Sequence, residues 1–155
     1  MNHNMYHNPI VQDNIQKLER FGYEMIAPDR GMLANGDDGD GRMPEPEVLF
    51  EYILRELAFE KDLAGKKVLV TAGATMEAID PVRYITNHSS GKMGCAVAKA
   101  AMQRGAKVTL VAGHMEVLPP MFVDVVNVKS AADMFEAVTK LAPEQDIIVK
   151  AAAVA

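Results

Sequence analysis

Hydrophobic positions in the second half of the chain form two continuous runs separated by a helical pattern. Lys67 to Thr71 and Lys107 to Gly113 are almost wholly apolar, as is typical of parallel strands that are covered on both faces. Between them, Lys92 to Arg104 has helical periodicity and is followed by Gly105. Its predicted apolar face consists of Met93, Val97, Ala100 and Ala101. Strand, crossover helix and strand together predict a βαβ unit, which binds ligands at the carboxyl ends of its strands.

The rest of the pattern predicts a small number of further elements. Helices are expected at Val11 to Phe21 and at Ser130 to Leu141, and strands at Tyr23 to Ala27 and at Asp146 to Ala151. Gly22 ends the first helix and Ser130 is the N-cap of the second. Residues 47–65 place Leu49, Ile53 and Leu57 at helical spacing, which predicts a linker helix.

The stretch from Asp80 to Gly94 is the strongest candidate for a ligand-binding loop. It is about three times longer than a usual strand-to-helix connection, and long insertions in compact domains are commonly functional. Ser89, Ser90 and Gly91 offer hydroxyl and N–H donors at the start of the following helix, where a phosphate or carboxylate is favoured. The alternative is an ordinary helix capped by Ser89 or Ser90. Arg83 within this stretch either binds an anion or pairs with Asp80.

As a literal string, Lys67 to Gly94 closely resembles the start of the phosphopantothenoylcysteine synthetase domain of the bifunctional coenzyme A biosynthesis flavoproteins. The closing run Ala151 to Ala155 resembles the same domain, in which the run precedes an Asp that helps to bind the cytidine nucleotide. That Asp and an essential lysine of the family would lie C-terminal to Ala155. We therefore expect the chain to be an internal piece of such an enzyme.

The first part of the chain resembles the partner decarboxylase domain of the same family. Met1 to Tyr6 is similar to the second half of its Pro-x-Met-Asn-x-x-Met-Trp substrate motif, which makes Asn2 a substrate contact. Gly31 to Met43 resembles its mobile, glycine-rich substrate clamp. Asn35 stands where that clamp carries a proton-donating cysteine, and a carboxamide is not a usable acid near neutral pH. The resemblance thus implies an impaired decarboxylase.

The expected fold class is α/β: the C-terminal part of a flavodoxin-like decarboxylase domain, followed by the first half of a Rossmann-like, parallel-sheet synthetase domain. The predicted boundaries are 1–46 for the decarboxylase part, 47–65 for the linker helix and 66–155 for the synthetase half.

The resemblance implies CTP-dependent ligation of 4′-phosphopantothenate with cysteine through an acyl-cytidylate, followed by FMN-dependent decarboxylation of phosphopantothenoylcysteine to 4′-phosphopantetheine in the full-length enzyme. Its cofactors would be FMN in the decarboxylase domain, and CTP and Mg²⁺ in the synthetase domain. Asn87 matches the catalytic asparagine of the family, and Ser89, Ser90 and Gly91 would bind substrate. The residues expected at the nucleotide are Gly73, Lys150, Ala151 and Ala152.

Several synthetase positions depart from the family pattern. These are Ala74 for Gly or Pro, Met76 for Arg, His114 for Pro, and Lys150 for an apolar residue. An ammonium group is costly to bury without a partner, so Lys150 either points toward nucleotide phosphates or lies on an exposed edge. These departures weaken the expectation of activity, and the opposing class of function is a catalytically silent piece that binds a ligand or a partner. A nicotinamide-binding module is disfavoured because Ala72 to Glu77 lacks the Gly-x-Gly-x-x-Gly pattern.

Composition and charge narrow the remaining classes. The net charge of −5 argues against binding to nucleic acid or to an anionic membrane, and no apolar run is long enough to span a bilayer. The single cysteine, Cys95, excludes an internal disulfide and is expected to be a core thiol. We expect a cytoplasmic protein that forms a homo-oligomer when full length.

No metal site is expected in the chain itself. His3 and His7 have a helical i, i+4 spacing, but Asn8 and Pro9 argue against a helix and no third ligand is evident. Asp37 to Gly41 lacks the acidic twelfth residue that a calcium loop requires.

Overall fold

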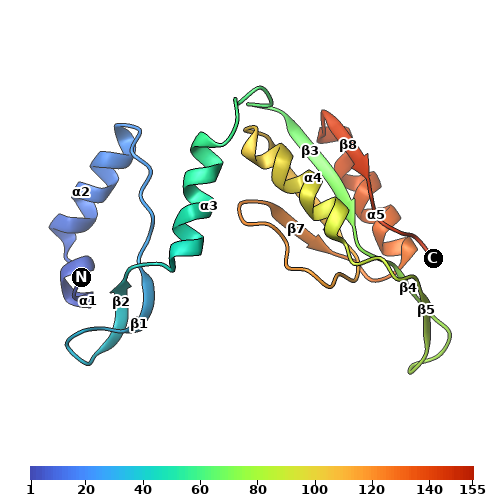
Figure 1. The fold of residues 1–155 in the computed structure, drawn as a ribbon, viewed down its shortest axis with the longest axis horizontal. Helices are drawn as coiled ribbons and strands as arrows, with labels where there is room; N and C mark the ends of the chain where they lie inside the picture. Colours follow the sequence, from blue (N-terminus) through green and yellow to red (C-terminus); the bar gives the residue numbers. More distant parts are fainter. The chain divides into compact units, whose positions relative to one another are not determined.

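The computed structural model describes residues 1–155, which divide into two compact units, Met1–Phe50 and Glu51–Ala155. The first unit contains α1 (His3–Tyr6), α2 (Pro9–Arg20), β1 (Asp29–Met32) and β2 (Asp38–Arg42). Helix α3 (Pro46–Leu57) contains the division between the units, and it lies within the predicted linker helix except for its first residue. Figure 1 shows the helices and strands of both units.

The second unit contains the elements predicted from the apolar runs and three short strands that were not predicted. Its elements are β3 (Lys67–Ala72), β4 (Met76–Ala78), β5 (Tyr84–Thr86), α4 (Lys92–Gln103), β6 (Lys107–Ala112), β7 (Asp124–Asn127), α5 (Ala131–Leu141), a single 3-10 turn (Ala142–Glu144) and β8 (Ile147–Lys150). No helix in the structure combines the length and the apolar content needed to cross a membrane.

The two helices at the start of the chain form because each has a side-chain cap. The Oδ1 atoms of Asn2 and Asn8 accept hydrogen bonds from the backbone N–H groups of Asn4 and Ile10, at 2.9 and 3.0 Å. Pro9 at the first position of α2 has no N–H to leave unpaired. The predicted helix at Val11 to Phe21 is therefore confirmed with an earlier start. The expectation that Asn8 and Pro9 prevent a helix at His3 was wrong, because α1 ends before Asn8.

The predicted strand at Tyr23 to Ala27 was also wrong. This segment has no strand partner. Pairing occurs further on, where β1 and β2 form an antiparallel hairpin that begins two residues before the predicted glycine-rich clamp and includes most of it. Gly39 and Gly41 permit this hairpin to approach the N-terminal segment. A Cβ atom at position 39 would lie 2.9 Å from the ring of His3, and one at position 41 would collide with the Met1 carbonyl. Backbone pairing, rather than apolar content, decides where the strand forms.

The second unit is built on a parallel sheet with the strand order β7-β6-β3-β8. The predicted strands at Lys67, Lys107 and Asp146 are confirmed, with β3 lying between β6 and β8. Strand β7 was missed because only four residues pair there and most of their surface stays exposed, so they lack the continuous apolar run of a covered strand.

Alternate residues of the central strands pack against helices on opposite faces, as Figure 1 shows for α4 and α5. Val68, Val70 and Ala72 of β3 face α4, whereas Leu69 of the same strand faces α5. The period of two along a strand makes this division. Ser130 caps α5 as predicted: its hydroxyl accepts from the Asp133 N–H, and the Asp133 carboxylate accepts from the Ser130 N–H.

The buried face of α4 is rotated by one position from the face predicted. Met93 is 72% exposed and Ala100 is exposed, whereas Ala101 is buried as expected and Val97 is half-buried. The residues that face the sheet are Gly94, Cys95, Ala98, Ala101 and Met102. A Cβ atom at Gly94 would lie 2.4 Å from the Cβ of Ala72, so the helix approaches β3 through its smallest side chains. The prediction from hydrophobicity chose the wrong face, because the close approach of α4 to β3 depends on the size of the side chains between them.

The predicted binding loop contains a regular strand. Strands β4 and β5 form an antiparallel hairpin from Met76 to Thr86, whose second strand lies inside the loop. Asp80 holds its turn: Oδ1 accepts from the N–H groups of Val82 and Arg83, and Oδ2 accepts from the Arg83 guanidinium at 2.6 Å. The backbone N–H groups keep the pKa of Asp80 below its ordinary value. Arg83 therefore pairs with Asp80, the structural alternative considered above.

Candidate functional site

Three parallel strands end at one edge of the sheet, and their backbones are tied together there. The residues that follow β3, β6 and β8 are Gly73, Gly113 and Ala151. The Ala74 N–H donates to the His114 carbonyl at 2.9 Å, and the Ala153 N–H donates to the Gly73 carbonyl at 2.8 Å. The carboxyl ends thus form one continuous surface, which is where open parallel sheets bind ligands.

Asn87 reaches this surface from the end of the hairpin. Its Nδ2 donates to the Ala153 carbonyl at 2.9 Å, and its Oδ1 accepts from the Ser89 N–H at 3.2 Å. The side chain is half-buried. A carboxamide nitrogen carries two hydrogens, so one N–H remains available to a ligand after the bond to Ala153. Two contacts from different parts of the chain therefore orient the amide.

The start of α4 differs from the capped helix considered as an alternative. Its N-cap is Gly91, with a φ of +77°, and no side chain accepts from the first turn. The alternative, in which Ser89 or Ser90 is the N-cap, was therefore wrong. A Cβ atom at position 91 would lie 2.7 Å from the Met115 Cγ atom, so glycine suits both the backbone angle and the space. The first N–H groups of α4 lack a side-chain acceptor, which leaves this helix end able to receive an anion.

The other predicted substrate and nucleotide residues lie close to these elements. Ser89 and Ser90 are half-buried, and the Ser90 carbonyl accepts from the Glu116 N–H at 3.1 Å. Ala151 and Ala152 are half-buried at the end of β8. Lys150 is exposed, so its ammonium group does not bear the cost of burial that its strand position implied.

Two residues that sequence reasoning missed organise this edge of the sheet. The Thr71 Oγ1 atom accepts from the N–H groups of both Ala151 and Ala152, each at 3.2 Å. Met115 lies against the positions where Cβ atoms of Gly73 and Gly91 would be, and its sulfur is 3.7 Å from the Cys95 Sγ atom. A polar residue at the end of an apolar run was the available signal for Thr71. Nothing local distinguished Met115.

Cys95 is a core residue, as expected. It is 8% exposed within the cluster between α4 and the sheet. Burial raises the pKa of its thiol, which keeps it protonated and chemically unreactive.

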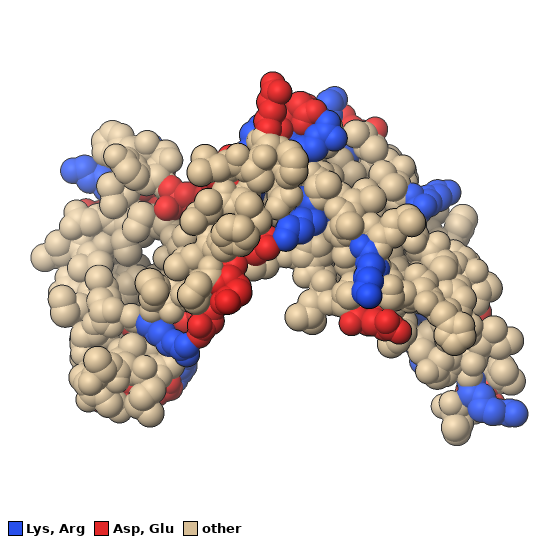
Figure 2. Space-filling model, in the orientation of Figure 1, with Lys and Arg blue, Asp and Glu red and all other residues tan.

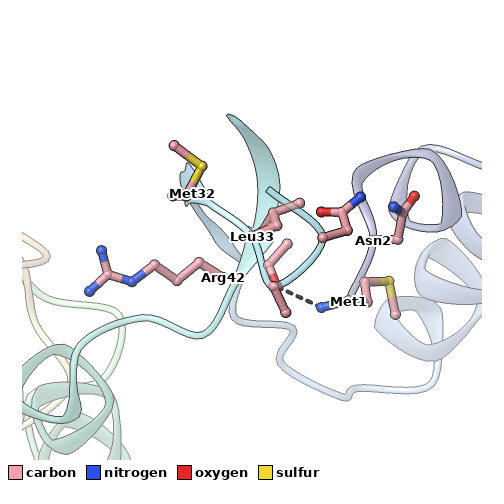
Figure 3. Close-up of a pocket in the computed structure, with 8 residues that line it drawn as sticks. Met1, Asn2, Met32, Leu33 and Arg42 are labelled. Carbon is pink, nitrogen blue, oxygen red and sulfur yellow. Dashed lines mark hydrogen bonds between the residues drawn. The ribbon is translucent and has the colours of Figure 1, made fainter. Parts of the chain in front are cut away.

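In the first unit, a cavity of about 410 Å³ brings together the two predicted decarboxylase residues, Asn2 and Asn35. Met32, Leu33 and Arg42 complete much of the lining, and Figure 3 shows Arg42 extending to the side opposite Met1 and Asn2. The Asn35 Nδ2 atom donates to the Asp37 carboxylate at 2.6 Å. This bond fixes a carboxamide, which has no acidic proton, where the clamp borders the cavity.

Charged groups are distributed over the molecule without a dominant sign. On the face drawn in Figure 2, acidic and basic side chains are interspersed. Several of them form exposed pairs, such as Arg30 with Asp38 at 3.1 Å.

Comparison with protein families gives two matches that divide the chain. A family model described as "DNA/pantothenate metabolism flavoprotein C-terminal domain" matches residues 63–155, and one described as "Flavoprotein" matches residues 1–58. The order agrees with the resemblance found in the sequence. A flavin cofactor is a property of the family that matches residues 1–58.

Curated relatives match the whole chain. The coenzyme A biosynthesis bifunctional protein CoaBC of Haemophilus influenzae is 48% identical over 155 residues, covering 100% of this chain and 39% of that protein. The protein of the same name from Vibrio vulnificus is 53% identical over 156 residues, covering 100% of this chain and 38% of that protein. The chain thus spans less than half the length of the relatives it matches.

A solved structure supports the same assignment of the second unit. The crystal structure of the C-terminal domain of a coenzyme A biosynthesis bifunctional protein CoaBC is 53% identical, with a TM-score of 0.57. The match covers 60% of this chain and 47% of that chain. The α/β fold class and the coenzyme A biosynthesis resemblance are both confirmed by these comparisons.

Proposed function

Because the chain belongs to the DNA/pantothenate metabolism flavoprotein family, we propose that it forms part of a bifunctional enzyme of coenzyme A biosynthesis. Residues 66–155 contribute to CTP-dependent ligation of 4′-phosphopantothenate with cysteine. Residues 1–46 contribute to FMN-dependent decarboxylation of the resulting phosphopantothenoylcysteine to 4′-phosphopantetheine. The boundaries at 46 and 66 are part of the proposal.

Amide formation requires an activated acid, because an amine does not attack an ionised carboxylate at a useful rate. Transfer of a cytidylyl group from CTP to the carboxylate of 4′-phosphopantothenate forms an acyl-cytidylate and releases pyrophosphate. Attack by the cysteine amine then forms the amide and releases CMP. Nucleotide and acid must therefore meet at one surface, and the joined carboxyl ends of β3, β6 and β8 are our candidate for it.

The proposed roles of the chain's own residues follow from their positions. Gly73, Ala151 and Ala152 present backbone with little side chain, which allows a nucleotide to approach closely. Ser89, Ser90 and Gly91 lead into the uncapped start of α4, which suits a phosphate group of the substrate. Lys150 is exposed near the end of β8 and is the candidate cation for the nucleotide phosphates. Mg²⁺, when bound with CTP, would neutralise phosphate charge.

The observation that carries the ligase proposal is the orientation of Asn87. With one N–H bonded to the Ala153 carbonyl and Oδ1 bonded to the Ser89 N–H, the second N–H is held at the strand ends. In the proposed mechanism this second N–H donates to the acyl oxygen, where negative charge develops as the amine attacks the acyl carbon. Loss of one such donor typically lowers kcat by about 10² to 10³-fold.

The test compares two variants of the full gene product that contains this chain. Asn87→Ala should still release pyrophosphate from CTP in a first turnover, but amide formation should fall by about 10² to 10³-fold. Thr86→Val is the matched control, because the Thr86 hydroxyl also bonds to backbone, donating to the Thr75 carbonyl at 2.7 Å. It should retain the amide-forming step. Equal losses in both variants would mean that Asn87 only anchors the loop.

If the unaltered protein neither releases pyrophosphate nor forms the amide, the catalytically silent alternative replaces the ligase proposal. Equilibrium dialysis with CTP and with 4′-phosphopantothenate then tests whether the protein binds these ligands. This result would refute catalysis by the protein but leave its family unchanged.

The decarboxylase proposal includes a weakened protonation step. FMN would supply the redox chemistry of decarboxylation, and Asn2 would contact the substrate in the cavity it shares with Asn35. Asn35 has no proton to donate near neutral pH. Asn35→Cys should therefore increase the rate at which the saturated product forms by about 10² to 10⁴-fold, measured by single-turnover mass spectrometry. An unchanged rate would show that another group supplies the proton.

We further propose a cytoplasmic homo-oligomer that acts on small-molecule substrates. Apolar side chains on the β4–β5 hairpin support self-association, since Val82 is 85% and Ile85 is 58% exposed. Light scattering of the full gene product tests this part of the proposal, which a monomer at micromolar concentration would refute.

A further inference from the structure

Two imidazoles and a carboxylate converge where α1 meets β2. Asp40 lies 37 positions after His3 and 33 after His7 in the sequence. His7 Nε2 is 2.8 Å from Asp40 Oδ2, and His3 Nδ1 is 3.8 Å from the same oxygen. One potential ligand atom from each residue lies within 4.8 Å of the other two. The two imidazole centroids are 4.4 Å apart. We propose that His3, His7 and Asp40 form a binding site for a divalent transition-metal ion.

The separations of the two imidazole nitrogens from Asp40 are close to those of a tetrahedral site. Metal–ligand distances of about 2.0 to 2.1 Å place the ligand atoms of a tetrahedral zinc site about 3.3 Å apart. The two separations from Asp40, 2.8 and 3.8 Å, lie on either side of that value. Three protein ligands leave one position, which water fills because the side chains are partly exposed.

The donor set determines the class of ion. Imidazole nitrogens with one carboxylate suit Zn²⁺, Co²⁺, Ni²⁺ and Cu²⁺, whereas Ca²⁺ and Mg²⁺ prefer sites made wholly of oxygen. At present the Asp40 N–H donates to His3 Nδ1 at 3.1 Å, so a bound ion would replace that hydrogen bond. The carboxylate of Asp40 already attracts the imidazole of His7, which holds the two groups together before the ion arrives.

The backbone around the three ligands is already organised. Asn2 caps α1 and so holds the helix that carries His3. Gly39, immediately before Asp40, has no side chain to separate the hairpin from His3, since a Cβ atom there would lie 2.9 Å from the ring. An ion bound here would fasten β2 to α1. This places it beside the cavity lined by Asn2 and Gly41, although the inference does not depend on the proposed function.

The test uses the untagged full gene product that contains this chain, with Zn²⁺ and Co²⁺ as probes. Competition with a chromophoric chelator should show one Zn²⁺ per chain, and Co²⁺ should give the visible absorption of a four-coordinate site. His7→Gln and Asp40→Asn should each weaken Zn²⁺ binding by about tenfold or more, since even partners of the ligands contribute that much. Asp40→Asn keeps a hydrogen-bonding side chain at the position, so loss of folding is not the expected cause.

Matched controls change the other imidazole and thiol groups of residues 1–155. His88→Gln and His114→Gln change the two histidines outside the site, and Cys95→Ser removes the only thiol of these residues. These variants should bind Zn²⁺ as the unaltered chain does. Absence of saturable binding at one ion per chain, or binding that persists in both His7→Gln and Asp40→Asn, would overturn the proposal. Circular dichroism of each variant confirms that the comparison is between folded proteins.

Discussion

Gly73 is the position where a single added methyl group should most clearly disturb the candidate site. It follows β3 with a φ of +79°, which a residue with a side chain rarely adopts. A Cβ atom there would lie 2.4 Å from the His114 carbonyl oxygen and 2.8 Å from Met115 Cγ. The nearer atom belongs to the backbone, so it cannot move aside as a flexible side chain would. Gly73→Ala therefore combines conformational strain with a steric clash.

Gly65 provides a matched control for the strain alone. It lies in the same unit with a φ of +77°, and a Cβ atom there would meet nothing within 4 Å. The left-handed backbone costs an alanine about 1 to 2 kcal/mol, less the gain from a stiffer unfolded chain, for a net cost of about 1 kcal/mol. The clash at Gly73 adds about 1 to 3 kcal/mol, as overpacking in a core does. We expect losses of about 1 kcal/mol for Gly65→Ala and about 2 to 4 kcal/mol for Gly73→Ala.

Thermal unfolding followed by circular dichroism measures both changes. Hydrogen exchange of the β3 and β6 amides assigns the transition to the second unit, because the chain has two units and need not unfold in one step. Each kcal/mol corresponds to roughly 4 °C or more for a domain of about 100 residues. Gly73→Ala should thus lower Tm by about 8 °C or more, and Gly65→Ala by about half as much or less. Equal shifts would refute the close approach of His114 to Gly73.

Three further predictions concern the sheet and its helices. Thr71→Val should lower the free energy of unfolding in urea by about 1 to 3 kcal/mol, because the Ala152 N–H loses its acceptor. Thr71→Ser keeps the hydroxyl and should retain most of the stability. Equal losses in the two variants would contradict this role of the hydroxyl. Leu69→Ala should lower the free energy of unfolding by about 2 to 5 kcal/mol, because this fully buried side chain packs under α5. Leu118→Ala, at a side chain that is 91% exposed, should change it by under about 0.5 kcal/mol. Similar urea-unfolding midpoints for the two variants would contradict the packing. The hydrogen bond from the Ser130 N–H lowers the pKa of Asp133, so the carboxylate stabilises the fold above its unfolded pKa of about 3.9, and this stabilisation is lost as pH falls through the lower folded pKa. The difference in Tm between the unaltered protein and Asp133→Asn should therefore shrink below about pH 4. A difference that stays constant from pH 7 to pH 2 would contradict this.

Local signals in the sequence were sufficient where one physical requirement dominated. The apolar runs at Lys67 and Lys107 predicted covered parallel strands because both faces of such strands must be apolar. Ser130 predicted the start of α5 because its hydroxyl reaches a nearby N–H within the same turn. The literal string from Lys67 to Gly94 also predicted the family, which the comparisons confirm.

The wrong predictions arose where side-chain size or strand pairing decided the structure. Tyr23 to Ala27 has strand-like composition but finds no partner, whereas the glycine-rich segment from Asp29 to Arg42 does. The face of α4 was misjudged because contact with β3 selects Gly94, the smallest side chain, over the more hydrophobic Met93. A local pattern carries no information about which backbone will lie opposite, and that neighbour decides both outcomes.

The candidate site divides in the same way. Asn87, Gly73 and the alanines after β8 were predicted as site residues from the family string, but their joint arrangement could not be predicted from it. The bonds from Asn87 to Ala153 and from Thr71 to Ala152 join positions 66 and 81 residues apart. The approach of Asp40 to His3 and His7 likewise depends on a hairpin folding back on α1. Sequence spacing predicts contacts within a helix or turn, whereas contacts between distant segments arise only when the folded backbone brings their atoms within hydrogen-bonding distance.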